Sequence, residues 1–71
     1  MAKFELTKSI DARTLNPRTM APLNHYRTIP FGAIIENLVD TGDMEQFTYL
    51  GEPYQYPRED LKAASRPIQP A

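Results

Sequence analysis

The sequence predicts a small all-β domain, and three observations support this prediction. Segments rich in β-branched and aromatic residues are short and recur at intervals of about ten residues. The turn-forming residues between these segments are Pro30, Gly32, Gly42, Gly51 and Pro53. The strongest helix signal, at residues 9–15, allows only one or two turns because Pro17 stops it.

The composition limits the chain to one small domain and excludes several kinds of site. The chain has 71 residues, a net charge of −1, no cysteine and one histidine. Disulfide bridges, thiolate zinc sites, cysteine nucleophiles and sites that need several histidines of one chain are therefore excluded. A nucleic-acid-binding chain would carry a basic excess to neutralise phosphates, so nucleic acid is not the expected partner.

No segment has the pattern of a targeting or membrane-spanning sequence. Lys3, Glu5 and Lys8 interrupt the N-terminal region, where a signal peptide would need an apolar stretch. The longest uncharged apolar-rich stretch, residues 29–35, is far shorter than the roughly 20 residues that a membrane helix needs. We therefore expect a cytoplasmic chain with no membrane partner.

The first part of the chain is expected to contain little regular structure. Residues 1–9 form a leader or a first strand in this prediction. Residues 16–24 hold two prolines and two asparagines, which predicts a long loop and therefore a candidate functional segment. Residues 26–29 contain β-forming side chains and lead into a turn at residues 30–32.

Two polar turns separate three strands in the middle of the chain. The expected strands are residues 33–39, 46–50 and 54–56, and the expected turns are residues 40–43 and 51–53. The central strand is the clearest because aromatic and polar side chains alternate along it. Gly42 can take the positive φ that the first turn favours.

The C-terminal part is expected to begin with a helical turn. Pro57 followed by acidic residues is typical of a helix start, which predicts one turn over residues 57–61. Residues 62–64 form a last short strand in this prediction. Residues 65–71 contain two prolines and are expected to form a flexible tail, so that the domain spans residues 10–64.

Three segments carry a resemblance to a known family of small barrels. The segment LNPRTMAPLNHYRTIPFG is followed by GAIIENLVDTGDMEQFTYLGEPYQYPREDLKAA, and within the second lies YPREDL. Their order of loop, strands, glycine turns and proline-led turn resembles Src-homology-3-like (SH3-like) barrels, and is closest to bacterial SH3 domains. The resemblance implies a single barrel of about five short strands with one 3₁₀ turn at residues 57–61.

The resemblance also bears on ligand choice. Eukaryotic members bind proline-rich peptides in a groove that needs a tryptophan, a proline and a tyrosine. Pro57 matches the proline, whereas Phe47 and Asp60 stand at the tryptophan and tyrosine positions. Binding of ordinary proline-rich peptides is therefore not expected, and the bacterial members imply binding to cell-wall material or to other peptides.

Four aromatic residues form the most suggestive cluster in the sequence. Phe47 and Tyr49 share one face of a strand, and Tyr54 and Tyr56 share one face of the next. Across a hairpin they would form an aromatic ladder. The cluster fits a partner-binding surface, and it equally fits core and cross-strand packing, in which Phe47 and one tyrosine are buried.

The remaining polar residues are expected to be solvated. His25 has no sequence partner that would orient it as a base, and a loop histidine is the simpler interpretation. Asp40, Asp43 and Glu45 are too few and too closely spaced for a calcium loop, so a polar turn is preferred.

Charged pairs and a basic patch are also possible on sequence grounds. Arg58 lies near three acidic residues in the sequence, Glu52, Glu59 and Asp60. Ion pairs between such exposed side chains contribute little to stability. Arg13, Arg18 and Arg27 fall in or near the long loop and would form a modest basic patch for a phosphate or an acidic peptide.

Together these observations favour a non-enzymatic interaction module that binds a peptide or protein partner through residues 16–28 and an aromatic surface. No catalytic or metal-ligand motif is recognisable in the sequence, so no cofactor is expected. One alternative is an assembly subunit that self-associates through the same face, and another is a single-stranded nucleic-acid binder. The candidate partner-binding residues are Tyr26, Phe47, Tyr49, Tyr54, Tyr56, Pro57, Arg18 and Arg27.

Overall fold

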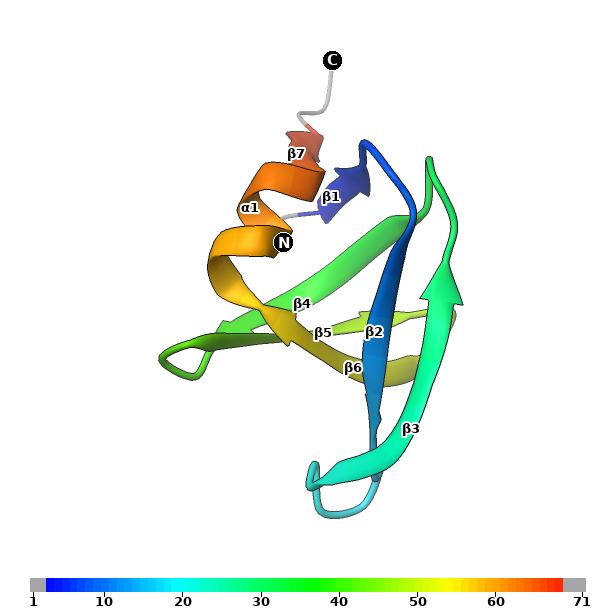
Figure 1. Cartoon of the computed structure of the whole chain (residues 1–71), viewed down its shortest axis with the longest axis vertical. Helices are drawn as coiled ribbons and strands as arrows, with labels where there is room; N and C mark the ends of the chain where they lie inside the picture. Colours follow the sequence, from blue (N-terminus) through cyan, green and yellow to red (C-terminus); the bar gives the residue numbers. More distant parts are fainter. Residues whose placement is uncertain (1–2, 69–71) are drawn as a thin grey trace.

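The computed structural model describes residues 3–68, which form seven strands and one short helix (Figure 1). In chain order the elements are β1 Lys3–Leu6, β2 Ile10–Leu15, β3 Pro22–Ile29, β4 Ile34–Asp40, β5 Met44–Tyr49, β6 Glu52–Pro57, α1 Arg58–Ala64 and β7 Ser65–Ile68. The expectation of an all-β chain is confirmed, but the expectation of about five strands is wrong.

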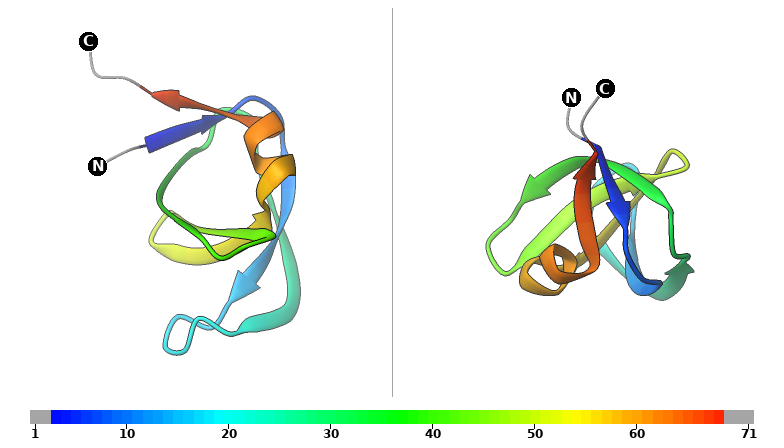
Figure 2. Two further views of the ribbon diagram at one scale, coloured as in Figure 1. Left: turned by 90° about the vertical axis from the view of Figure 1, so that its left-hand side faces the viewer. Right: turned by 90° about the horizontal axis from the view of Figure 1, so that it is seen from above.

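All seven strands belong to one antiparallel sheet with the order β3-β2-β6-β5-β4-β1-β7. The sheet is curled but not closed, since β3 and β7 stand at its two ends. β1 and β7 lie side by side, and the β2–β3 hairpin projects away from the other strands (Figure 2). This projection stretches the molecule to 36 Å along its longest axis, against 23 and 22 Å across.

The core lies on the inner face of the curled sheet. Its buried residues are Leu6, Ile10, Ala12, Ile29, Ala33, Ile35, Phe47, Tyr54, Leu61 and Ala64. Phe47 and Tyr54 face each other across the β5–β6 pair, and their rings stack with centroids 5.9 Å apart. A chain with few large aliphatic residues thus fills its core with an aromatic pair.

The weak helix signal at residues 9–15 does not correspond to a helix, because residues 10–15 form strand β2. Ile10 and Ala12 are both buried, which is the period of two that a strand presents to a core. The polar residue between them, Asp11, is exposed. The β-branched side chains that weaken a helix here also favour the strand.

The loop predicted at residues 16–24 is shorter than expected, because β3 begins at Pro22. A proline is tolerated at the first residue of an edge strand, where its missing N–H costs no ladder hydrogen bond. The remaining loop closes on itself: the Asn16 N–H donates to the Ala21 carbonyl at 2.9 Å, and the Met20 N–H donates to the Asn16 carbonyl.

The strands and first turn expected between residues 33 and 56 are confirmed, with boundaries shifted by one or two residues. The second turn consists of Leu50 and Gly51, and Glu52 and Pro53 already belong to β6. The aromatic ladder expected across this hairpin is confirmed for Phe47 and Tyr54, which are direct cross-strand partners.

The predicted C-terminal elements need a correction, because residues 58–64 form an α-helix rather than a 3₁₀ turn and a strand. Leu61 and Ala64 are three residues apart on the face of α1 that joins the core. Glu59 and Asp60 lie in the first turn, where carboxylates favour a helix. Residues 65–68 of the expected tail form β7, and residues 69–71 lie outside the described residues.

Candidate functional site

A groove lies between the β2–β3 hairpin and the start of α1, and it encloses about 290 Å³. We call it the hairpin groove. It is lined by Asp11, Arg13, Tyr26, Met44, Gln55, Tyr56, Pro57 and Asp60. These residues come from five elements, so the fold and not the sequence order assembles the groove.

Strand register explains why the groove residues meet. Arg13 is opposite Tyr26 on β3 and opposite Gln55 on β6, and residues directly opposite one another share one face of a sheet. Met44, the first residue of β5, is opposite Pro57, the last residue of β6. The hairpin wall and the strand ends before α1 therefore border the same hollow.

Tyr26 forms an exposed wall of the groove, with 59% of its surface accessible. The Arg13 guanidinium carbon lies 5.9 Å from the centre of the Tyr26 ring, within range of a cation–π contact. Arg13 Nε also donates to the Leu23 carbonyl at 2.8 Å, which fixes the guanidinium on the hairpin. Tyr26 is thus an aromatic surface held open toward solvent.

Two carboxylates give the groove an acidic side. Asp11 Oδ1 accepts a hydrogen bond from the Thr28 hydroxyl at 2.7 Å, and Asp60 lies exposed in the first turn of α1. The same lining contains the apolar side chains of Met44, Tyr56 and Pro57 and the polar side chains of Arg13 and Gln55. This arrangement suits a bound segment that presents one apolar and one basic side chain.

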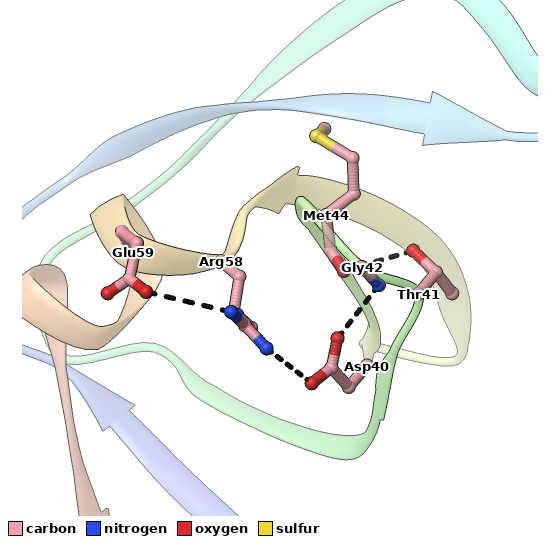
Figure 3. A network of polar contacts seen from close by, with 6 residues as sticks. All are labelled: Asp40, Thr41, Gly42, Met44, Arg58 and Glu59. Atoms are coloured by element: carbon pink, nitrogen blue, oxygen red, sulfur yellow. Dashed lines mark hydrogen bonds and ion pairs between the residues drawn. The ribbon is translucent and has the colours of Figure 1, made fainter.

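An ion pair attaches the start of α1 to the β4–β5 turn (Figure 3). Arg58 Nη1 lies 2.7 Å from Asp40 Oδ2, and the Arg58 N–H donates to the Asp43 carbonyl at 2.9 Å. The Gly42 N–H donates to Asp40 Oδ1 at 2.9 Å. These contacts position Pro57 and the helix that follows it against the groove.

The same contacts set the ionisation of Asp40. The hydrogen bond from the Gly42 N–H, and then the hydrogen bond and charge of Arg58, hold the pKa of the Asp40 carboxyl below its ordinary value. The acidic residues expected near Arg58 from the sequence are Glu52, Glu59 and Asp60, and they do not include Asp40. Glu59 Oε1 does lie 3.7 Å from Arg58 Nη2, but Glu52 pairs with Arg27 instead.

A second hollow of about 500 Å³ lies on the opposite face of the hairpin, beside the β5–β6 turn. Leu23, His25 and Arg27, on alternate positions of β3, line it. Arg27 Nη1 lies 3.0 Å from Glu52 Oε2, which also accepts a hydrogen bond from the Tyr54 hydroxyl at 3.1 Å. This cluster connects the projecting hairpin to β6.

The structure distributes the predicted partner-binding residues over several places. Tyr26, Tyr56 and Pro57 line the hairpin groove. Phe47 and Tyr54 are buried, with 1% of each surface accessible, because they fill the core.

The other three candidates lie outside the groove lining. Tyr49 is half-buried against the core. Arg18 lies in the hairpin loop, where its N–H donates to Asn16 Oδ1 at 2.8 Å. Arg27 lies on the other face of the hairpin, in the second hollow.

Sequence reasoning missed Asp11, Arg13, Met44 and Gln55 as groove residues. The first two would have been found by interpreting residues 10–15 as a strand, because they alternate with the buried Ile10 and Ala12. No local pattern marks Met44 or Gln55, which reach the groove only through pairing of β5 and β6 with distant strands.

Residues 3–68 contain neither a metal-binding cluster of side chains nor a membrane-spanning helix. This range contains no group of three histidine, cysteine, aspartate or glutamate side chains close enough to hold a metal ion together. Its single helix is too short and too polar to cross a membrane. Comparison with models of protein families, with curated proteins and with solved structures found no match to this chain.

Proposed function

We propose that the chain is a non-enzymatic interaction module whose hairpin groove binds an extended segment of a partner protein. The observation that carries this proposal is the exposed Tyr26 ring, which lines the same hollow as Pro57 and Asp60. Exposed aromatic residues beside apolar pockets are common anchors in protein interfaces. We expect the bound segment to place an apolar side chain on the aromatic wall and a basic side chain near Asp60.

We also propose that the fold is SH3-like. The order of a first strand, a long hairpin, three antiparallel strands, a helical turn and a last strand supports this assignment. Met44 rather than Phe47 stands beside Pro57, which supports a ligand other than an ordinary proline-rich peptide. Self-association through the same groove is the alternative, and peptide binding to a monomer would contradict it.

An array of ten-residue peptides tests the proposal. Half of the peptides carry one arginine and one leucine or tyrosine at varied spacing, and half carry glutamate in place of the arginine. We expect the purified protein to bind members of the basic half. Changing Tyr26→Ala or Asp60→Asn is expected to weaken that binding about tenfold, since anchor residues contribute about 1–2 kcal/mol or more.

Phe31→Ala is the matched control, because Phe31 is an aromatic residue with 74% of its surface exposed and lies outside the groove lining. This variant should bind as the unchanged protein does. An equal loss of peptide binding in Phe31→Ala and Tyr26→Ala would exclude the groove as the binding site. Equal binding of the arginine and glutamate peptides would exclude it as well.

A further inference from the structure

The two ends of the open sheet differ in how well they are protected against pairing with another strand. β7 is four residues long and has Pro67 within it, while Arg66 is held by Glu5 at 2.7 Å. Short length, proline and charge are the features that natural edge strands use to prevent pairing. β3 has eight residues, and its only proline is the first of them, Pro22. Its first seven residues are exposed.

The backbone of β3 presents unpaired groups on the side away from β2. The His25 carbonyl faces β2, because it accepts a hydrogen bond from the Thr14 hydroxyl at 3.0 Å. Backbone groups of successive strand residues point to opposite sides. The N–H and carbonyl groups of Tyr26 and Thr28 therefore point outward, where the described part of the chain supplies no further strand.

The β2–β3 hairpin that carries this edge has a positive net charge. Its charged residues are Arg13, Arg18 and Arg27 against one carboxylate, Asp11, and Arg27 also pairs with Glu52 of β6. His25 and Arg27 are on one face of β3, whereas Tyr26 and Thr28 are on the other. A strand added here would place every second side chain beside His25 and Arg27.

We propose that the outer edge of β3 accepts an extended acidic segment of a partner protein as an additional antiparallel strand. Carboxylates at every second position lie beside Arg27 and His25, and β-branched or apolar side chains lie beside Tyr26 and Thr28. A second copy of β3 is the less suitable occupant, because it would bring together two hairpins that each carry a positive net charge. The proposal concerns the backbone edge, and it does not depend on ligand binding in the hairpin groove.

A synthetic eight-residue peptide of alternating glutamate and valine is the probe. Titrated into the ¹⁵N-labelled protein, it should shift the amide signals of Tyr26 and Thr28 and slow their hydrogen exchange about tenfold or more. The same peptide N-methylated at its valine residues, which lie opposite Tyr26 and Thr28, cannot form the ladder and should leave these signals unchanged. N-methylation at the glutamate residues leaves the pairing edge free, and this matched peptide should still bind. A lysine–valine peptide should bind more weakly, and added salt should reduce the difference.

Variants of Thr28 provide an independent check on the protein side. Thr28→Pro removes the outward N–H, whereas Thr28→Val loses the hydroxyl contact with Asp11 but keeps the N–H. We expect only Thr28→Pro to lose peptide binding. The N-methylated peptides test the unchanged protein, so the proposal remains falsifiable even if Thr28→Pro does not fold.

Three results would overturn the proposal. The first is equal binding of the N-methylated peptides, and the second is a set of shifts confined to Met44 and Asp60 of the groove. The third is a dimer of the unchanged protein in sedimentation that dissociates in Thr28→Pro, because this would make a second copy the occupant of the edge. Unchanged groove binding in Tyr26→Ala would count against the proposed function and not against strand addition.

Discussion

At the residue scale, Asp40 joins parts of the chain that are distant in sequence. Its two carboxylate oxygens hold the Gly42 N–H and the Arg58 guanidinium, which lies 18 residues further along the chain. Neither contact is visible in the sequence, where Asp40 is one of several acidic residues in a polar turn. Asp40 therefore has a structural role that its neighbour Asp43 does not share through its side chain.

Changing Asp40→Asn should lower the free energy of unfolding most at neutral pH. The pKa of Asp40 is lower in the folded chain than its ordinary value, so its stabilising effect is present above that ordinary value. The effect is lost as the pH falls through the folded pKa. Urea unfolding at pH 7, 4 and 2.5 should thus show a difference between the two proteins that shrinks in acid. Asp43→Asn is the control, and a pH-independent difference for Asp40→Asn would contradict the assignment.

At the scale of elements, the β5–β6 hairpin contains an unfavourable turn residue. Tyr49 and Glu52 are paired, so Leu50 and Gly51 form a two-residue turn, with φ values of 53° and 80°. Two consecutive positive φ values correspond to the type I′ turn, which favours asparagine followed by glycine. Leu50 is 83% exposed, so its side chain contributes almost no packing to offset this strain.

We therefore expect Leu50→Asn to raise the free energy of unfolding by about 1 kcal/mol. In a domain of this size that gain corresponds to a rise in Tm of about 4–8 °C. Thermal unfolding followed by circular dichroism measures it. Leu50→Ala removes the exposed side chain without the turn preference of asparagine, and an equal rise in both variants would argue against backbone strain as the cause.

The elements that could be predicted from the sequence are those with a buried face or a glycine turn. The aromatic strand around Phe47 and the turn at Gly42 have strong local signals, and both were placed correctly. Only residues 26–29 of β3 could be recognised, because the exposed position of this strand leaves it without hydrophobic alternation. The helix after Pro57 was predicted too short, because Leu61 and Ala64 show their common face only once the core is known.

At the scale of the whole molecule, β7 completes the sheet beside the N-terminal strand. The Thr7 backbone N–H donates to the Ala64 carbonyl at 2.7 Å, and the four residues of β7 pair with Lys3–Leu6.

Replacing residues 65–68 by Gly-Ser-Gly-Ser should cost about 2 kcal/mol or more of unfolding free energy, because glycine weakens strands. Urea unfolding measures this loss. Arg66→Ala, the control, removes one exposed ion pair and should cost no more than about 1 kcal/mol.

The residues of the hairpin groove could be predicted only in part from the sequence. Pro57 and Tyr26 were recognised because prolines and aromatic residues are conspicuous in any sequence. Their partners Arg13, Met44 and Gln55 depend on the order β3-β2-β6-β5, which long-range pairing determines and which no local pattern encodes. The all-β class could thus be predicted, whereas the composition of the site could not.

The pairing of β1 with β7 also has a consequence for synthesis of the protein. Lys3 is opposite Ile68, so β1 leaves the ribosome well before its partner β7. At about 5–20 residues per second this delay is several seconds. During it, the core lacks the buried Leu61 and Ala64 of α1. The core is complete only when residues 58–68 have emerged, and until then its apolar residues remain open to aggregation.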